Sequence, residues 1–252
     1  AGVVLGSGFS GSVTLATNKT LSVGFNGITI SGGSLVGNTK KITSSGDLAI
    51  SNGLFNSVAS DVEIKGSVQL SGGTLKSSTY SFKVGGNYTK TGGTFDALGF
   101  VTFNGFGGQT ILAGGTDSGS DFADVNISFG TVTVSSALKV NGNLTVNSGQ
   151  LKNNATIQLA GNLSNNGGYI NDQSSALWVL NGSVAQTVKL QNHKLKDIQV
   201  SNSTNKVTFL DELNANELKG DAGVSIFIEK GKFVELSKLT LNGTLAQPVG
   251  FK

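Results

Sequence analysis

Apolar and polar residues alternate in short stretches along the whole chain. Ile28-Thr29-Ile30 and Val62-Glu63-Ile64 are typical, and clusters of Gly, Asn and Ser separate one stretch from the next. Alternation of this length predicts short β-strands with one buried face, and the clusters supply turn residues that tolerate positive φ. Only residues 210–219 have moderate helical propensity, and their alignment with residues 136–142 favours a strand there as well.

The alternating stretches recur every 20 residues. Segments 27–35, 47–55, 67–75 and 87–95 align without a gap, so that residues of one kind fall into columns. The columns are Ile28, Leu48, Val68 and Tyr88; Ile30, Ile50, Leu70 and Lys90; Gly33, Gly53, Gly73 and Gly93; Leu35, Phe55, Leu75 and Phe95; and Ile42, Val62 and Phe82. Like residues at a constant spacing predict stacked coils in which each column forms a ladder.

Lys90 interrupts one of these apolar columns. A lone ammonium group is costly to bury. We therefore predict that the coil bulges at this position or that the Lys90 side chain reaches solvent.

A longer repeat lies over the short one. Residues 101–111 match residues 178–188, an offset of 178 − 101 = 77 residues or roughly four coils. The match pairs Asn104 with Asn181, Gly105 with Gly182 and Gln109 with Gln186. We interpret it as the duplication of a multi-coil block, with copies over about 66–140 and 142–215, inside a single domain of residues 1–252. Residues 1–26 are predicted to be N-terminal capping or entry strands.

These patterns favour an all-β fold, a right-handed parallel β-helix (β-solenoid) with coils of about 20 residues. A propeller or a sandwich is the alternative. Both need long hairpins with Asn-Gly or Asp-Gly turns, and a fixed 20-residue column register is harder to explain in either.

Composition removes several classes of protein. The chain has no Cys, which excludes disulfides and Cys-ligated metals, and its one His, His193, excludes a two-His zinc site. Its net charge of +3 comes from scattered Lys and no Arg, which argues against nucleic-acid binding. No apolar run approaches the roughly 18 residues of a membrane helix. Because the chain starts Ala1-Gly2-Val3 without Met, we interpret it as a mature product or an excised domain.

Three repeat units carry a resemblance to a known family: GGNYTKTGGTF (85–95), GNLTVNSGQL (142–151) and GNLSNNGGYI (161–170). They resemble the coils of filamentous-haemagglutinin-like and related bacterial surface parallel β-helices, and the C-terminal KLTLNGTLAQPVGFK also looks like a coil frequent in such proteins. The resemblance is one of repeat type and covers most of residues 27–250. It implies an extracellular or cell-surface stalk, adhesin segment, or filament or surface-layer building block. Its partners would be other copies, neighbouring domains of a larger surface protein, or surface glycans.

Polysaccharide-degrading enzymes share the β-helix fold, so a carbohydrate-binding or polysaccharide-degrading module is the alternative function. Lyases of that type use an Arg base, which this chain lacks, and hydrolases of that type need clustered Asp residues near a His. His193 lies in LQNHKLKD without paired carboxylates, and Asp117, Asp121 and Asp124 have no calcium-loop spacing and indicate a solvated turn. We therefore expect no catalytic residues, no metal site, no cofactor and no enzyme activity.

One candidate interaction patch emerges from apolar runs that have no polar face. These are Leu177–Leu180, with Trp178, Val179 and Leu180, and Phe100–Phe103, with Phe100 and Phe103. One face of each strand must then meet the protein's own loops, a neighbouring subunit, or a ligand such as a sugar ring.

Overall fold

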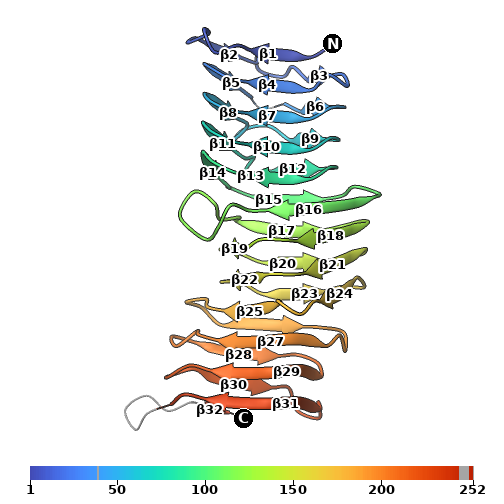
Figure 1. Cartoon of the computed structure of the whole chain (residues 1–252), viewed down its shortest axis with the longest axis vertical. Helices are drawn as coiled ribbons and strands as arrows, with labels where there is room; N and C mark the ends of the chain where they lie inside the picture. Colours follow the sequence, from blue (N-terminus) through green and yellow to red (C-terminus); the bar gives the residue numbers. More distant parts are fainter. Residues whose placement is uncertain (39, 244–249, 252) are drawn as a thin grey trace.

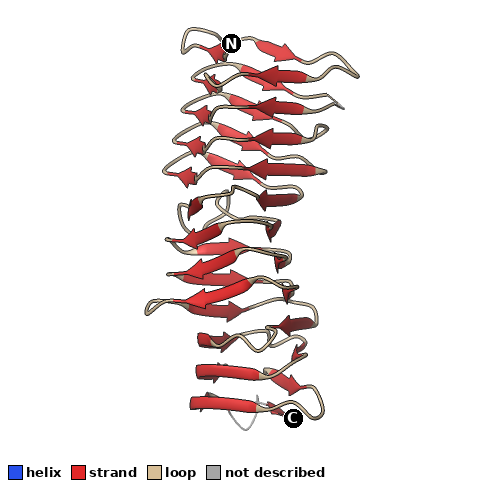
Figure 2. Cartoon of the chain, turned by 90° about the vertical axis from the view of Figure 1, so that its right-hand side faces the viewer, coloured by secondary structure: helices blue, strands red, loops and turns tan. Residues whose placement is uncertain are grey.

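The chain forms a rod of stacked coils, seen in a computed structural model that describes residues 1–38, 40–243 and 250–251 (Figure 1). Its strands pair in parallel and build four sheets that run along the rod. No helix occurs in these described ranges (Figure 2), and accordingly none that is long and apolar enough to cross a membrane. The predicted all-β solenoid is confirmed.

Two sheets occupy two sides of the rod. Sheet A has nine strands: β1 (Val3–Leu5), β4 (Ile28–Ile30), β7 (Leu48–Ile50), β10 (Val68–Leu70), β13 (Tyr88–Lys90), β16 (Gly108–Leu112), β18 (Thr131–Val134), β21 (Gln150–Asn153) and β24 (Tyr169–Asp172). Sheet C has twelve: β3 (Leu21–Val23), β6 (Ile42–Ser44), β9 (Val62–Ile64), β12 (Ser81–Val84), β15 (Phe100–Phe103), β17 (Asp124–Ile127), β20 (Leu144–Val146), β23 (Leu163–Asn165), β26 (Gln186–Lys189), β28 (Lys206–Phe209), β30 (Ser225–Ile228) and β32 (Gly250–Phe251).

The third side changes from one sheet to another. Sheet B serves the upper coils with β2 (Ser12–Thr14), β5 (Ser34–Val36), β8 (Leu54–Asn56), β11 (Thr74–Lys76) and β14 (Thr94–Asp96). Sheet D serves the lower coils with β19 (Leu138–Val140), β22 (Thr156–Leu159), β25 (Leu177–Leu180), β27 (Leu195–Val200), β29 (Leu213–Gly220) and β31 (Val234–Leu241). The segment 113–123, a wide loop at the left of Figure 1, separates the two.

The predicted columns form ladders in the predicted register. Leu48 pairs with Ile28 above and with Val68 below, and the same holds along the other columns. The Gly column lies at turns with positive φ: Gly53 has φ +82°, and a Cβ added to it would lie 2.4 Å from the carbonyl oxygen of Gly33. Coils stacked this closely leave no room for a side chain, so the column requires Gly.

Lys90 itself stays in register with Leu70 above it, and the chain departs from the ladder in the coil below. Pairing between β13 and β16 stops at Thr89, opposite Leu112, and the chain then leaves the stack in the 113–123 loop. The partly buried Lys90 ammonium donates to Ser120 Oγ at 3.0 Å. The loop therefore supplies a polar partner where a regular coil would place an apolar one.

The residues that match in the long repeat lie at a corner of the rod, where the chain turns from one sheet to the next, and not on the face of a sheet. Gln109 Nε2 donates to the carbonyls of Val84 and Gly86, and its Oε1 accepts from Gly105 N. Gln186 makes the same bonds at its own corner, to Leu159, Gly161 and Gly182. The first corner joins sheet C to sheet A and the second joins sheet D to sheet C, so the offset falls one side short of four coils.

The coils below β24 have two sides instead of three. Below β24 the chain runs in one long strand, β27, β29 or β31, where upper coils have two strands, and residues 213–220 are indeed a strand. At the lower end, Leu239 pairs with the buried Leu218 but is itself 46% exposed. The inward positions of β31 thus form an apolar end surface.

Candidate binding groove

The five residues of the sequence-derived patch do not form a common surface. Trp178, Phe103 and Leu180 are core residues, with at most 2% of each side chain exposed. Phe100 projects from sheet C and is 54% exposed, whereas the half-buried Val179 lies on sheet D. The protein's own core covers the rings of Trp178 and Phe103, whereas the Phe100 ring is exposed.

Trp178 instead fixes a carboxylate. Its indole Nε1 donates to Asp172 Oδ2 at 2.8 Å and to Oδ1 at 3.1 Å, and the Lys196 backbone N–H donates to Oδ2 at 2.8 Å. Asp172 is the last residue of β24, so these bonds tie the end of sheet A to the start of β25 and to β27. Burial raises the pKa of the Asp172 carboxyl, and the bonds from Lys196 N and Trp178 oppose the rise.

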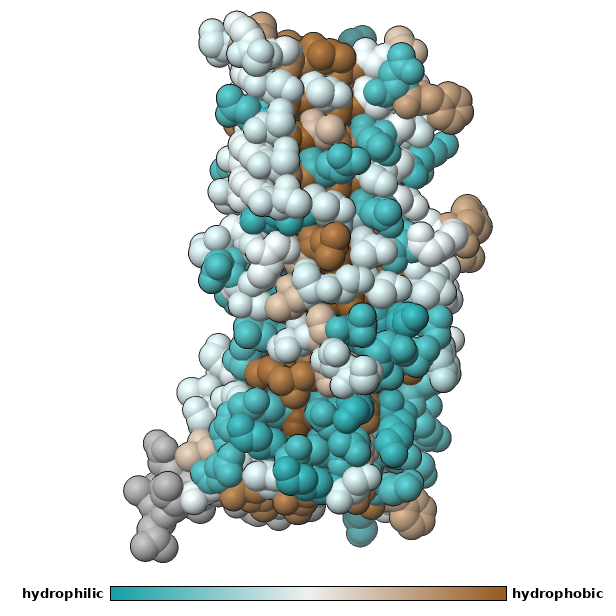
Figure 3. Space-filling view, in the orientation of Figure 1, coloured by the Kyte–Doolittle hydropathy of each residue, from teal (hydrophilic) through white to brown (hydrophobic). Residues whose placement is uncertain are grey.

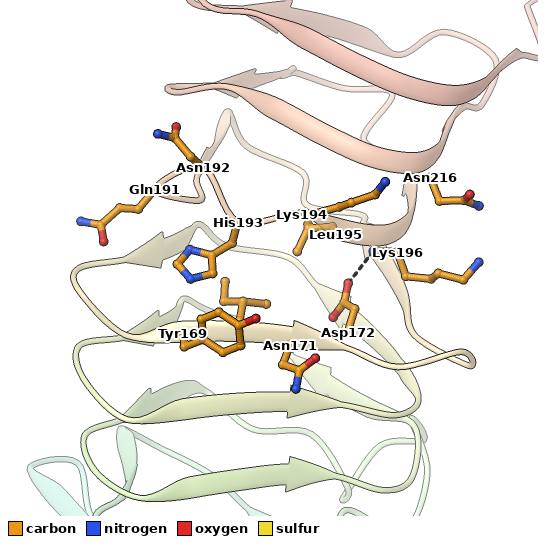
Figure 4. Close-up of a pocket in the computed structure, with 11 residues that line it drawn as sticks. Tyr169, Asn171, Asp172, Gln191, Asn192, His193, Lys194, Leu195, Lys196 and Asn216 are labelled. Carbon is orange, nitrogen blue, oxygen red and sulfur yellow. Dashed lines mark hydrogen bonds between the residues drawn. The ribbon is translucent and has the colours of Figure 1, made fainter.

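A groove of about 630 Å³ opens beside this carboxylate (Figure 4). It forms because β24 is the last strand of sheet A and has no ladder partner on its lower side. In the next coil the chain makes a tight turn over residues 190–194 and enters β27. The lining residues are Tyr169, Ile170, Asn171, Asp172, Gln191, Asn192, His193, Lys194, Leu195, Lys196 and Asn216.

The turn that forms one wall is held from the coil below. Gln191 and Asn192 have positive φ, 52° and 63°, which is unusual outside Gly. The Asp211 carboxylate accepts from Leu190 N at 2.9 Å and from Gln191 N at 2.5 Å. These bonds hold the turn that lines the groove in place without a ligand.

Two aromatic rings stand at one end of the groove (Figure 4). Tyr169 is 53% exposed, and its ring contacts His193 edge to face with centroids 4.9 Å apart. His193 Nδ1 lies 2.9 Å from the carbonyl oxygen of Leu190. The amide nitrogen Nδ2 of Asn165 also lies 3.2 Å from His193 Nδ1, so two groups hold the imidazole in place from the same side.

Lysines dominate the charge of the groove. Lys196 Nζ lies 3.4 Å from Asp197 Oδ2, whereas no carboxylate of the described residues lies within ion-pair distance of Lys194. In Figure 4 the Lys194 side chain points away from Tyr169, towards the opposite side of the view. The groove therefore offers one uncompensated cation.

Two of the three acidic residues in and next to the 113–123 loop, Asp121 and Asp124, have partners for their side chains. Asp121 accepts from Lys139 Nζ at 3.1 Å and from Asn141 Nδ2 at 2.8 Å, and these bonds lower its pKa although burial opposes them. Asp124 accepts from the backbone N of Asn143. Across the described residues no three acidic, His or Cys side chains gather as metal ligands would.

A second surface feature lies along the turns that join sheet C to sheet A. Phe25 and Phe106 are each 89% exposed, and Phe106 contacts Phe129 with ring centroids 5.3 Å apart. Apolar side chains project along the right-hand edge of Figure 3, where these turns lie. Phe106 and Phe129 thus form a small exposed apolar pair at this edge of the rod.

Sequence reasoning missed the groove and Tyr169. The available signals were the QNHK turn, which follows a strand without the usual Gly, and the aromatic residue after Gly167-Gly168. Their meaning depends on the missing sheet A strand below β24, which no single coil reveals.

No family model matches the chain, and neither a curated protein nor a solved structure matches it.

Proposed function

We propose that the chain is a non-enzymatic structural or adhesive segment at the cell surface or outside the cell, of the filamentous-haemagglutinin-like type. It would serve as a stalk, an adhesin segment, or a building block of a filament or surface layer. One observation carries the proposal: a single apolar cluster runs from Leu5 to Ile226 without a break, and sheet C pairs along the same length. Close packing and continuous ladders make such a rod stiff.

Its proposed partners are further solenoid coils, supplied by another copy or by a neighbouring domain. The apolar end surface supports this, because Val234, Leu239 and Leu241 occupy inward positions and are 41–46% exposed. Stacked coils would bury them and pair the open edges of the last strands.

The absence of enzyme activity is part of the proposal. The groove is lined by one carboxylate, Asp172, which is already bound to Trp178 and the Lys196 backbone, whereas most glycoside hydrolases use two. Carbohydrate binding without turnover is the second candidate, and the groove favours it.

Small-angle scattering and sedimentation over a range of concentrations test the rod. Twelve strands in sheet C give eleven steps of about 4.8 Å, or a rod of roughly 53 Å per copy. A compact or hinged particle would contradict the stiff rod, and short rods at every concentration would contradict self-stacking. Antibody labelling of intact source cells tests the location, which labelling only after lysis would contradict.

A further inference from the structure

We propose that the groove below β24 binds an acidic saccharide. This inference deepens the second candidate function, carbohydrate binding, by naming the class of sugar, and it does not depend on the role of a rod. It rests on an exposed aromatic ring, surrounding amide groups, a fixed wall and one uncompensated cation, all within the groove.

The Tyr169 ring provides the apolar contact. A sugar ring has a face of C–H groups and an edge of hydroxyls, so it stacks on an aromatic face while its edge stays polar. Tyr169 is 53% exposed, and the edge-to-face contact with His193 limits the movement of its ring. The groove volume of about 630 Å³ is within the range of small-ligand sites.

Amide side chains provide the polar contacts. Asn171, Gln191 and Asn192 line the groove, and each amide both donates and accepts, as a sugar hydroxyl does. Asn216 also lines it, with its Nδ2 already donated to Asp197. A lining with this mixture suits a polyhydroxylated ligand better than an apolar one.

The groove is organised in the absence of ligand. Asp211 holds the turn from below, while Trp178 and the Lys196 backbone hold Asp172. Side chains and turns that are already ordered lose little conformational freedom on binding.

The charge selects an acidic sugar. Lys194 has no carboxylate partner among the described residues, and the Asp172 carboxylate is already bonded to Trp178 and to the Lys196 backbone. A sugar carboxylate near Lys194 would gain a charge-assisted bond. Uronic and sialic acids both carry this group, so the proposal names the shared chemistry.

Binding can be tested by NMR titration of the isotopically labelled chain. The probes are a trigalacturonic acid, 3′-sialyllactose and the neutral lactose. We expect at least one acidic probe to shift the amide signals of residues 169–172 and 190–196, more strongly than lactose does. No shift with either acidic probe at millimolar concentration, or shifts confined to another region, would overturn the proposal.

Variants separate stacking from charge. Tyr169→Ala should weaken binding about tenfold and Tyr169→Phe by much less, while Lys194→Gln should weaken the acidic probe by a similar factor. Tyr80→Ala and Lys19→Gln are matched controls, since Tyr80 is also exposed and both residues lie outside the groove. Unchanged binding in Tyr169→Ala overturns the site. Unchanged binding in Lys194→Gln, or equal binding of lactose, overturns the acidic class.

Discussion

Gln186 offers a direct test of how the corners of the rod are held. The side chain is 1% exposed and makes four hydrogen bonds: its Nε2 donates to Leu159 O and Gly161 O, and its Oε1 accepts from Gly182 N and Asn202 Nδ2. In Gln186→Ala, Leu159 O keeps a bond from Asn181 N. The other two backbone groups lose the partner that Gln186 supplied.

A buried backbone group left without its partner costs about 1–3 kcal/mol. Two such groups together with the vacated side-chain volume give an expected loss of roughly 3–5 kcal/mol in the free energy of unfolding. Gln109→Ala should cost about 1 kcal/mol less, because Gln109 has the same three backbone bonds but no bond like that from Asn202.

Urea unfolding followed by Trp fluorescence measures the loss. Trp178 is the only Trp and lies in β25, the strand that leads into the Gln186 corner. Gln69→Ala on the exposed face of β10 is the control and should change stability by less than about 0.5 kcal/mol. If Gln186→Ala costs no more than Gln69→Ala, the buried amide does not hold the corner and the reasoning is refuted.

Three further predictions concern single positions. Gly53→Ala should destabilise the protein by about 2 kcal/mol or more, because the added Cβ would meet Gly33 O at a residue with positive φ. Gly6→Ala is the control and should not destabilise it, since the space around Gly6 is open. Equal unfolding midpoints for the two variants would contradict this prediction. In an NMR titration, the Asp172 carboxyl should show a pKa above its ordinary value of 3.8. Because the folded state then binds the proton more tightly than the unfolded state, the contribution of Asp172 to stability should fall as pH rises through the folded-state pKa. A titration midpoint at or below 3.8 would count against this prediction. Tyr88→Phe should raise stability by about 1 kcal/mol in urea unfolding, because Tyr88 Oη is buried without a partner among the described residues, and a loss would show that the hydroxyl is bonded.

The stacking of the coils could be predicted from sequence because it depends on one periodic signal. Each column of the 20-residue repeat becomes a ladder, since parallel strands in register place like residues above one another. An exception at Lys90 could also be expected, because a lone buried charge is costly, but the loop that supplies Ser120 as its partner could not be derived from the column.

The candidate site could not be predicted in the same way. Trp178 stood out because Leu177–Leu180 is apolar throughout, yet Trp178 and Leu180 face the core, while Leu177 and Val179 are half-buried outside it. The groove depends on the coil that lies below β24, where sheet A ends and Asp211 of the next coil holds a turn. A column alignment records what repeats, and this site lies where the repeat changes.

The Gln109 corner joins sheets C and A, whereas the Gln186 corner joins sheets D and C, and this shift affects how a rod would lengthen by duplication of the block. The three backbone bonds that Gln109 and Gln186 share involve only a turn and the coil before it, so the corner works at either edge of the cross-section. A block copied at this offset adds length and also swings everything after it around the long axis by one side. A groove or exposed ring duplicated with the block would then point in a new direction. Growth by this unit would distribute contact points around the circumference, so that a longer rod could be approached from several sides.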